Sequence, residues 1–302
     1  MRITLTSTYA KTAREINQKK EDLDRLTTMA SSGSRILKQA DDPLAWSQAM
    51  DFRQTIRQID AFQKNIDFAV GWNQVSDNAL NRVTDLVERA KQLAIQAISA
   101  PSTAKREAQT QELNQIIEEA VNLANSQYRD QYVFSGRQFS TAPFTLTKDA
   151  SGEVQSISGY QGDTQDLEVR TGNGVRQAVN INGQDVFGNP DNTSGILYEL
   201  LQLKNAVRDG DTTAIQQQEA AIDASYQNLQ HQSAIVGTRL EAFDEKKSLL
   251  DSIKIDDQSQ LSDIADADMA EVISQLQQKQ TVFQAVLRVT GLLAELNLTR
   301  FL

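Results

Sequence analysis

The stretch that decides the fold is DDPLAWSQAMDFRQTIRQIDAFQKNIDFAVGWNQVSDNALNRVTDLVERAKQLAIQA, residues 41–97. Asp42 suits a helix N-cap, because its carboxylate accepts the free N–H groups of the first turn, and Pro43 suits the first helical position, which needs no donor. No proline follows before Pro101. The segment therefore predicts one continuous helix, roughly 85 Å long at about 1.5 Å per residue.

Small or apolar residues recur every seven positions along this predicted helix, in two interleaved series. Such a seam is typical of helices that pack along their whole length. Its polar members Asn73 and Ser76 are either core residues that set the register or a sign that the seam turns to solvent, and the sequence leaves both open. The two series are Phe52, Ile59, Ile66, Asn73, Leu80, Val87, Ala94 and Thr55, Phe62, Ala69, Ser76, Val83, Ala90, Ala97.

A second segment repeats this regularity and predicts a long helix that lies antiparallel to the first. Shorter helices are expected after Pro101 and over residues 196–208, and Asp209-Gly210-Asp211 supplies a glycine C-cap followed by an aspartate N-cap. We expect Trp46 and Trp72 to pack rather than to bind a ligand. The apolar residues at every seventh place of the second segment are Ile215, Ile222, Leu229, Val236, Phe243 and Leu250.

The two chain ends carry weaker apolar stripes, which the sequence predicts as assembly contacts. Isolated helices of this kind are marginal in water, so each end is expected to stay loose until it meets a partner helix. Residues 1–40 carry eight Lys/Arg against four Asp/Glu, and residues 241–302 carry eleven acids against six bases, so the ends are expected to attract each other. The last helix is predicted to begin near Ser262. The stripe residues are Tyr9, Ile16, Leu23, Leu26 and Met269, Val272, Leu276, Phe283, Val286, Leu287, Leu293.

The middle of the chain has a different composition. Nine of the 14 glycines fall between residues 136 and 195. Short strands are predicted at 144–147, 166–170 and 178–181, the last followed by an Asn182-Gly183 turn. The predicted fold is mainly α, with long antiparallel helical rods from both chain halves and a small β-rich insertion. The predicted domains are 1–40 with 257–302, a rod of 41–136 with 196–256, and the insertion 137–195.

Several function classes are disfavoured by composition. A net charge of −10 argues against a general nucleic-acid binder. The chain has no cysteine, and His231 is its only histidine, so we expect no catalytic residues, no metal site and no cofactor. The turn Gly172-Asn173-Gly174 lacks the Lys-Ser/Thr of a P-loop. No apolar window reaches the length of a membrane span, and the N-terminus does not resemble a cleavable signal peptide.

Short motifs distributed over nearly the whole chain resemble the family of bacterial flagellins and flagellar hook-associated proteins. Their order and spacing carry the resemblance. They are Arg35 within Ser32-Gly33-x-Arg35-Ile36, Asp41-Asp42-Pro43, Asn65, Gly237 and Arg239 within Val236-Gly237-Thr238-Arg239, and Asp266-Ala267-Asp268 with Glu271. Two further runs, Tyr132-Val133-Phe134-Ser135-Gly136 and Tyr160-x-Gly162-Asp163, are similar to hook-associated members rather than to filament flagellin.

The resemblance implies a structural subunit without enzymatic activity. Members of this family leave the cell unfolded through the flagellum's own type III apparatus and assemble outside the cell by pairing their terminal helices. The implied partners are copies of the chain itself, a neighbouring hook-associated protein on the hook side, flagellin on the filament side and an export chaperone at the C-terminal helix. Nucleic acid and membrane are not among them. Filament flagellin is the alternative, and a flagellin-like protein with a hydrolase insert is a distant third.

Overall fold

A computed structural model describes residues 5–99 and 102–298 of the chain. Side chains are described from Ala10 to Leu292 within these ranges, except that of Asn192. The chain forms two compact units, unit 1 from Met1–Gln58 with Ser252–Leu302 and unit 2 from Ile59–Asp251. Within the described ranges, every helix is too short or too polar to cross a membrane.

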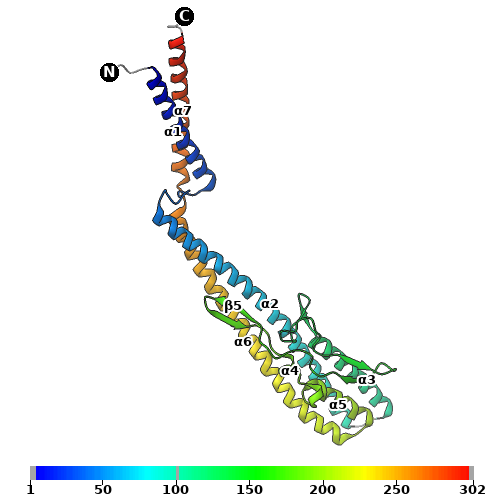
Figure 1. Cartoon of the computed structure of the whole chain (residues 1–302). Helices are drawn as coiled ribbons and strands as arrows, with labels where there is room; N and C mark the ends of the chain where they lie inside the picture. The colour runs from blue at the N-terminus through cyan, green and yellow to red at the C-terminus, as the bar shows by residue number, and fades with distance from the viewer. Residues whose placement is uncertain (1–4, 100–101, 299–302) are drawn as a thin grey trace. The chain divides into compact units, whose positions relative to one another are not determined.

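Long helices dominate the fold, and the strands form three small antiparallel hairpins, β1 with β2, β3 with β4 and β5 with β6 (Figure 1). This confirms the predicted fold class. In chain order the elements are α1 Leu5–Ser32, α2 Pro43–Ser99, α3 Thr103–Ala124, β1 Gln127–Tyr128, β2 Gln131–Tyr132, β3 Leu146–Lys148, β4 Val154–Ile157, β5 Glu168–Gly172, β6 Val175–Ala178, α4 Gly183–Phe187, the 3₁₀ turn Pro190–Asn192, α5 Ile196–Asp209, α6 Thr212–Ala265 and α7 Met269–Leu298.

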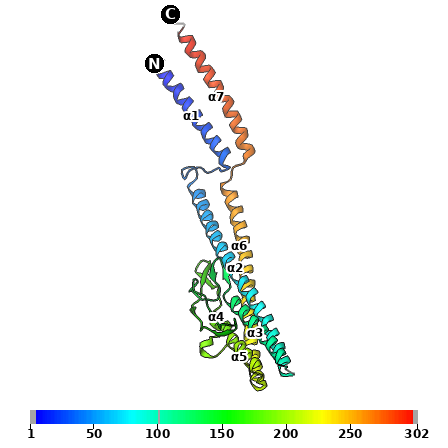
Figure 2. The ribbon, with the colours of Figure 1, turned by 90° about the vertical axis from the view of Figure 1, so that its right-hand side faces the viewer.

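In unit 2 the helices α2 and α6 lie side by side and antiparallel, as Figures 1 and 2 both show. Polar contacts along the pair fix this direction, because the partner's residue number falls as that of α2 rises. Gln63 donates to Asp251 (2.6 Å), Lys247 contacts Asp67 (2.6 Å), and Lys91 contacts Asp223 (2.5 Å). The expected antiparallel pair of rods is therefore present.

The heptad seam is the core of this pair. From Ile59 to Ala97 all its members are buried except the half-buried Phe62, whereas Thr55, which lies in unit 1, is exposed. Every seventh residue of α6 from Ile215 to Leu250 is buried as well. Apolar burial is the main favourable term in folding, so this seam stabilises unit 2 more than any polar contact along it.

Asn73 and Ser76 are core residues, each only 1% exposed, so the alternative that the seam turns to solvent is wrong. The Asn73 amide donates to Ala69 O (2.8 Å) and the Ser76 hydroxyl donates to Trp72 O (3.1 Å). Both bonds stay within α2. They satisfy the buried polar groups but do not involve a second helix, so a role of Asn73 and Ser76 in setting the register stays a prediction.

Aromatic side chains fill the space between the helices and the middle segment. The Trp72 ring is fully buried and lies 6.0 Å from Phe139 and 6.4 Å from Tyr128, centroid to centroid. Farther along, Phe187 lies edge-on to Phe134 at 5.0 Å. The expected packing role of Trp72 is confirmed, while Trp46, in unit 1, is half-buried.

Glycines in the middle segment permit contacts that a side chain would block. Gly136 has a φ of +68°, and a Cβ built on it would lie 2.1 Å from Asp163 O. The Asp163 carboxylate accepts from the N–H groups of Arg137 (2.7 Å) and Gln165 (3.1 Å), so the loop is folded tightly against itself. Tyr160 closes the same loop, because its hydroxyl shares its single proton between the backbone carbonyls of Phe134 (2.8 Å) and Asp163 (2.9 Å).

Two predicted boundaries are wrong. The segment 178–181 is not a strand beyond Ala178, and Asn182 begins the short helix α4 instead of a hairpin turn, because its side chain accepts from Gln184 N (2.9 Å). The last helix does not begin near Ser262. Helix α6 continues to Ala265, and α7 begins after Asp268, whose carboxylate accepts from the N–H groups of residues 270 and 271. The three predicted domains stay a prediction.

Substituting Gly136 and Gly174 by alanine should separate backbone strain from collision. The two glycines have nearly the same positive φ, +68° and +71°, but a Cβ at Gly174 meets nothing within 4 Å. We expect Gly174→Ala to cost about 1–2 kcal/mol, the strain of a left-handed residue. Gly136→Ala should cost at least about 2 kcal/mol more in urea unfolding, and equal losses would contradict the close contact with Asp163.

Candidate assembly surface

The terminal helices α1 and α7 pack against each other in unit 1, antiparallel and side by side in both Figures 1 and 2. Leu26 and Val272 are buried in this contact, at 8% and 5% exposure. Ile16, Leu23, Leu276, Phe283 and Val286 are half-buried. The side chains of Tyr9 and Leu293 lie outside the described residues. Of the eleven predicted stripe residues, seven thus lie partly or fully shielded in unit 1.

Met269 and Leu287, by contrast, are exposed at 38% and 45%. On a helix with 3.6 residues per turn they share one side of α7 with Ile273. Val282, Val289 and Leu292 occupy the opposite flank, with exposures of 40%, 54% and 59%. Apolar surface therefore continues around α7 on both sides of its contact with α1. The sequence analysis missed Ile273, Val282, Val289 and Leu292, although the seven-residue spacing from Val282 to Val289 could have indicated a second stripe.

The charge imbalance of the chain ends is not located at this helix pair. Lys279 and Asp22 form an ion pair across it (3.3 Å), with the acid on the N-terminal helix and the base on the C-terminal one. All but two of the eleven acidic residues in 241–302 precede α7. Apolar contact, rather than the excess charge, therefore holds α1 against α7.

The connector between α1 and α2 is fastened to the end of α6. Gly33, at a φ of +68°, ends α1. Arg35 then donates its backbone N–H to Ala265 O (2.7 Å) and its guanidinium to Ile264 O (2.8 Å), and Ala267 N donates back to Gly33 O (2.8 Å). The last carbonyls of a helix lack intrahelical donors and carry partial negative charge, so a cationic donor fits them.

The Asp-Asp-Pro motif organises the other end of the connector. Asp41 accepts from the N–H groups of Leu37 (3.1 Å) and Lys38 (3.0 Å) and lies 3.3 Å from the Arg25 guanidinium. These hydrogen bonds, that of Lys38 foremost, hold the pKa of Asp41 below its usual value. Asp42 accepts from Ala45 N (3.0 Å), which confirms the predicted N-cap with Pro43 as the first helical residue.

The motif residues Asn65, Gly237 and Arg239 lie in unit 2, where Asn65 and Arg239 hold the middle segment against the rods. The Asn65 amide on α2 donates to Arg170 O (2.9 Å) in β5, and the Arg239 guanidinium on α6 donates to Asn180 O. A Cβ built on Gly237 meets nothing within 4 Å among the described residues, so close packing does not require a glycine there.

The side chains that most often carry out catalysis or bind metals do not form a cluster among the described residues. His231 is exposed on α6. Among the residues that the structure describes, no three His, Asp or Glu side chains come together as metal ligands. The raised pKa of Tyr160 comes mainly from its burial, and its hydroxyl is engaged with backbone carbonyls.

Comparison with known proteins agrees with the helical arrangement. The sequence model described as "Bacterial flagellin N-terminal helical region" matches residues 3–138. Flagellar hook-associated protein 3 of Salmonella typhimurium is 23% identical over 308 aligned positions, which cover 94% of each chain. Residues 3–138 thus match the bacterial flagellin family, and the similarity to a flagellar hook-associated protein extends over nearly the whole chain.

Solved structures of the family have the same fold. The chain is similar to a putative flagellar hook-associated protein from Vibrio parahaemolyticus, with a TM-score of 0.66, 17% identity and coverage of 75% of this chain and 100% of that one. It is also similar to the flagellar junction protein FlgL from Legionella pneumophila, with a TM-score of 0.57, 16% identity and coverage of 72% and 99%.

Replacing Asp41 by asparagine should remove an acid-dependent step in the connector. Because the folded-state pKa of Asp41 is lowered, its stabilising contribution is present above the unfolded pKa of about 3.9 and is lost as the pH falls through the folded value. Exchange protection of the Leu37 and Lys38 amides should therefore drop in strong acid in the wild type but be low throughout in Asp41→Asn. Protection that is equal in both proteins would contradict this role.

Arg35→Ala should loosen the fastening of the connector to α6. The variant loses the charged donor to Ile264 O but keeps the backbone bond to Ala265 O, so we expect faster exchange at residues 34–36 and 266–268 with little change in unit 2. Arg35→Lys keeps the charge but not the rigid guanidinium fork, so its exchange rates at these residues should lie between those of the wild type and of Arg35→Ala. Unchanged exchange in the alanine variant would show that the backbone bonds suffice.

Proposed function

We propose that this protein is a structural subunit of the bacterial flagellum that acts as an adaptor at the junction between hook and filament. The main support is the similarity along 94% of the chain to a protein called flagellar hook-associated protein 3. The proposal places the protein outside the cell after secretion through the flagellar export apparatus. Its partners are copies of itself, a hook-associated protein on the hook side and flagellin on the filament side.

The exposed stripes of α7 support the assembly part of this proposal. Contiguous apolar surface is unusual on a soluble monomer and is typical of a contact site. Two flanks that face different directions suit contacts with two different neighbours. Repeated non-equivalent contacts of this kind build rings or helical lattices. An export chaperone that shields α7 before assembly fits the same surface.

Leu287→Glu should block incorporation into the flagellum. It places a carboxylate in the middle of an exposed apolar flank, where a neighbouring subunit would have to desolvate it. The far-UV spectrum and the stability of unit 2 should not change. Complementation of a deletion strain would be scored by filament number and by flagellin in the medium. Gln277→Glu, at an exposed polar position between the two apolar flanks of α7, serves as the matched control, and normal filaments with Leu287→Glu would contradict the proposed surface.

In the free subunit the terminal helices should exchange their amides quickly. Helices of 28 and 30 residues lose about 1–2 kcal/mol of backbone entropy per residue on ordering, while full burial of a large apolar side chain returns about 1.5–3 kcal/mol. Few side chains are fully buried between them, so we expect low protection in α1 and α7 beside high protection in α2 and α6. Strong protection of both ends in the monomer would overturn assembly-dependent ordering.

Filament flagellin is the alternative function. A flagellin should polymerise alone into long filaments, whereas a junction subunit needs a hook-side ring below it and flagellin above it. Electron microscopy of the concentrated, purified protein separates the two.

We also propose that the protein has no enzymatic activity. The distant alternative is a hydrolase site in the middle segment. The carboxylate of Asp163 accepts two backbone N–H groups, so a structural role accounts for it. A screen for peptide and glycoside hydrolysis with Asp163→Ala and Asp166→Ala would reveal a catalytic role.

A further inference from the structure

Helix α5 of unit 2 carries one buried and one half-buried ionisable side chain. Seven of its 14 residues are buried apolar side chains, and the helix packs against α3 and β4. Lys204 lies among them with 1% exposure. Glu199 lies on the same helix, half-buried, with its Oε2 atom inaccessible to water.

Lys204 is poorly satisfied for a buried ammonium group. Its Nζ donates to Val154 O, and no other hydrogen-bond acceptor for it is found among the described residues. An ammonium has three donors, and leaving charge unpaired in an apolar surrounding is costly. Burial accordingly lowers the pKa of Lys204, and so does the nearby Arg208, although Glu153 and Asp149 in the β3–β4 hairpin act in the opposite direction.

Glu199, on the other side of the helix, is likewise an ionisable side chain with incomplete hydrogen bonding. Its Oε2 atom has no hydrogen-bond partner. Burial raises the pKa of Glu199 against the hydrogen bonds from Ser225 on α6 and from the backbone at Gly195, which lower it. Among the described residues no opposite charge acts on this carboxylate, so its ionised form also reduces stability.

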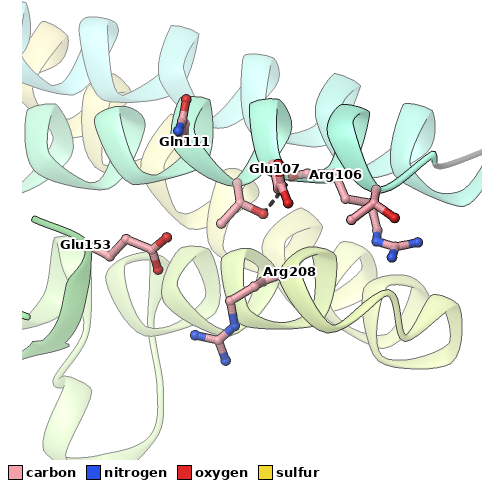
Figure 3. Close-up of a pocket in the computed structure, with 7 residues that line it drawn as sticks. Arg106, Glu107, Gln111, Glu153 and Arg208 are labelled. Carbon is pink, nitrogen blue, oxygen red and sulfur yellow. Dashed lines mark hydrogen bonds between the residues drawn. The ribbon is translucent and has the colours of Figure 1, made fainter. Parts of the chain in front are cut away.

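A polar cleft lies beside the α3–α5 contact. It has a volume of about 260 Å³ and is lined mainly by α3 together with Arg208 of α5 and Glu153 beside β4. Figure 3 shows Arg106, Glu107 and Gln111 extending from α3 around this space. Gln109, on the same helix, has a buried Oε1 atom without a partner. The contact between α3 and α5 is therefore interrupted by polar groups at the end of α5 that carries Lys204 and Arg208.

We propose that α5 is a built-in destabilising element, whose half-buried Glu199 and buried Lys204 keep unit 2 easy to unfold. Apolar side chains of similar size at these two places would give a more stable core, because removing a buried, unbalanced charge removes its desolvation cost. Low stability has a use in a subunit that crosses a narrow export channel unfolded, and this part of the inference rests on the proposed function.

The test uses the full chain with Glu199→Gln and Lys204→Met, each alone and combined. Exposed residues of the same types provide the controls Glu241→Gln and Lys105→Met. At neutral pH we expect the unfolding equilibrium constant of unit 2 to fall at least tenfold in the double variant, mainly through slower unfolding in urea. The controls should stay within twofold of the wild type.

The pH dependence separates a buried charge from a merely structural role. Because the pKa of Glu199 is raised in the folded state, the wild type gains stability as the pH falls. The amount by which Glu199→Gln exceeds the wild type in free energy of unfolding should therefore shrink in acid. Because the pKa of Lys204 is lowered in the folded state, the wild type gains stability as the pH rises. The amount by which Lys204→Met exceeds the wild type in free energy of unfolding should therefore shrink in base. If both variants are less stable than the wild type and the difference does not vary with pH, the proposal is wrong.

Export is measured separately in a flagellated host, as protein that reaches the medium from a strain lacking filaments. The double variant should appear several-fold more slowly than the exposed-residue controls. Equal export of stabilised variant and wild type would overturn the link between α5 and secretion. Failure of the wild type itself to be exported would instead overturn the proposed function.

Discussion

The apolar seam between α2 and α6 is the interaction on which unit 2 depends. It runs almost without interruption from Ile59 to Ala97 on one helix and from Ile215 to Leu250 on the other. Because the two helices are held over such a length, the middle segment needs only anchoring points on them, and Asn65 and Arg239 provide two through backbone carbonyls at Arg170 and Asn180. The small hairpins could not be stable alone, since isolated two-stranded hairpins are marginal in water.

The described residues of unit 1 form no comparable seam. The contact of α1 with α7 is narrow, and much of the apolar surface of α7 stays exposed on both flanks of it. The connector, in contrast, is held by a dense set of hydrogen bonds through Arg35 and Asp41. A well-defined attachment point that carries an incompletely covered helix pair is what a polymer subunit needs, because its neighbours then bury the remainder in one fixed geometry.

Polar residues inside the core have unequal consequences. Asn73 and Ser76 bond to their own helix, so burying them costs little. Glu199 and Lys204 keep unmet hydrogen-bonding capacity on a helix whose buried residues are otherwise apolar. The difference is one of charge as much as of partners, because a neutral amide or hydroxyl finds a nearby carbonyl easily, whereas an ionised group loses hydration that one hydrogen bond does not replace.

Sequence by itself determined the long helices, their antiparallel pairing, the N-cap at Asp42 and the glycine-rich character of the middle segment, because heptad spacing, caps and glycine content are local signals. It could not determine that Asn182 begins a helix, that α6 extends to Ala265, or that Met269 and Leu287 point away from α1. Those outcomes depend on residues distant in the chain, which decide which of several possible hydrogen bonds forms and which face of a helix is covered. Only the tertiary structure placed Lys204 in the core, since a lysine on a helix is ordinarily solvated and its burial follows from the helices and hairpin packed around it.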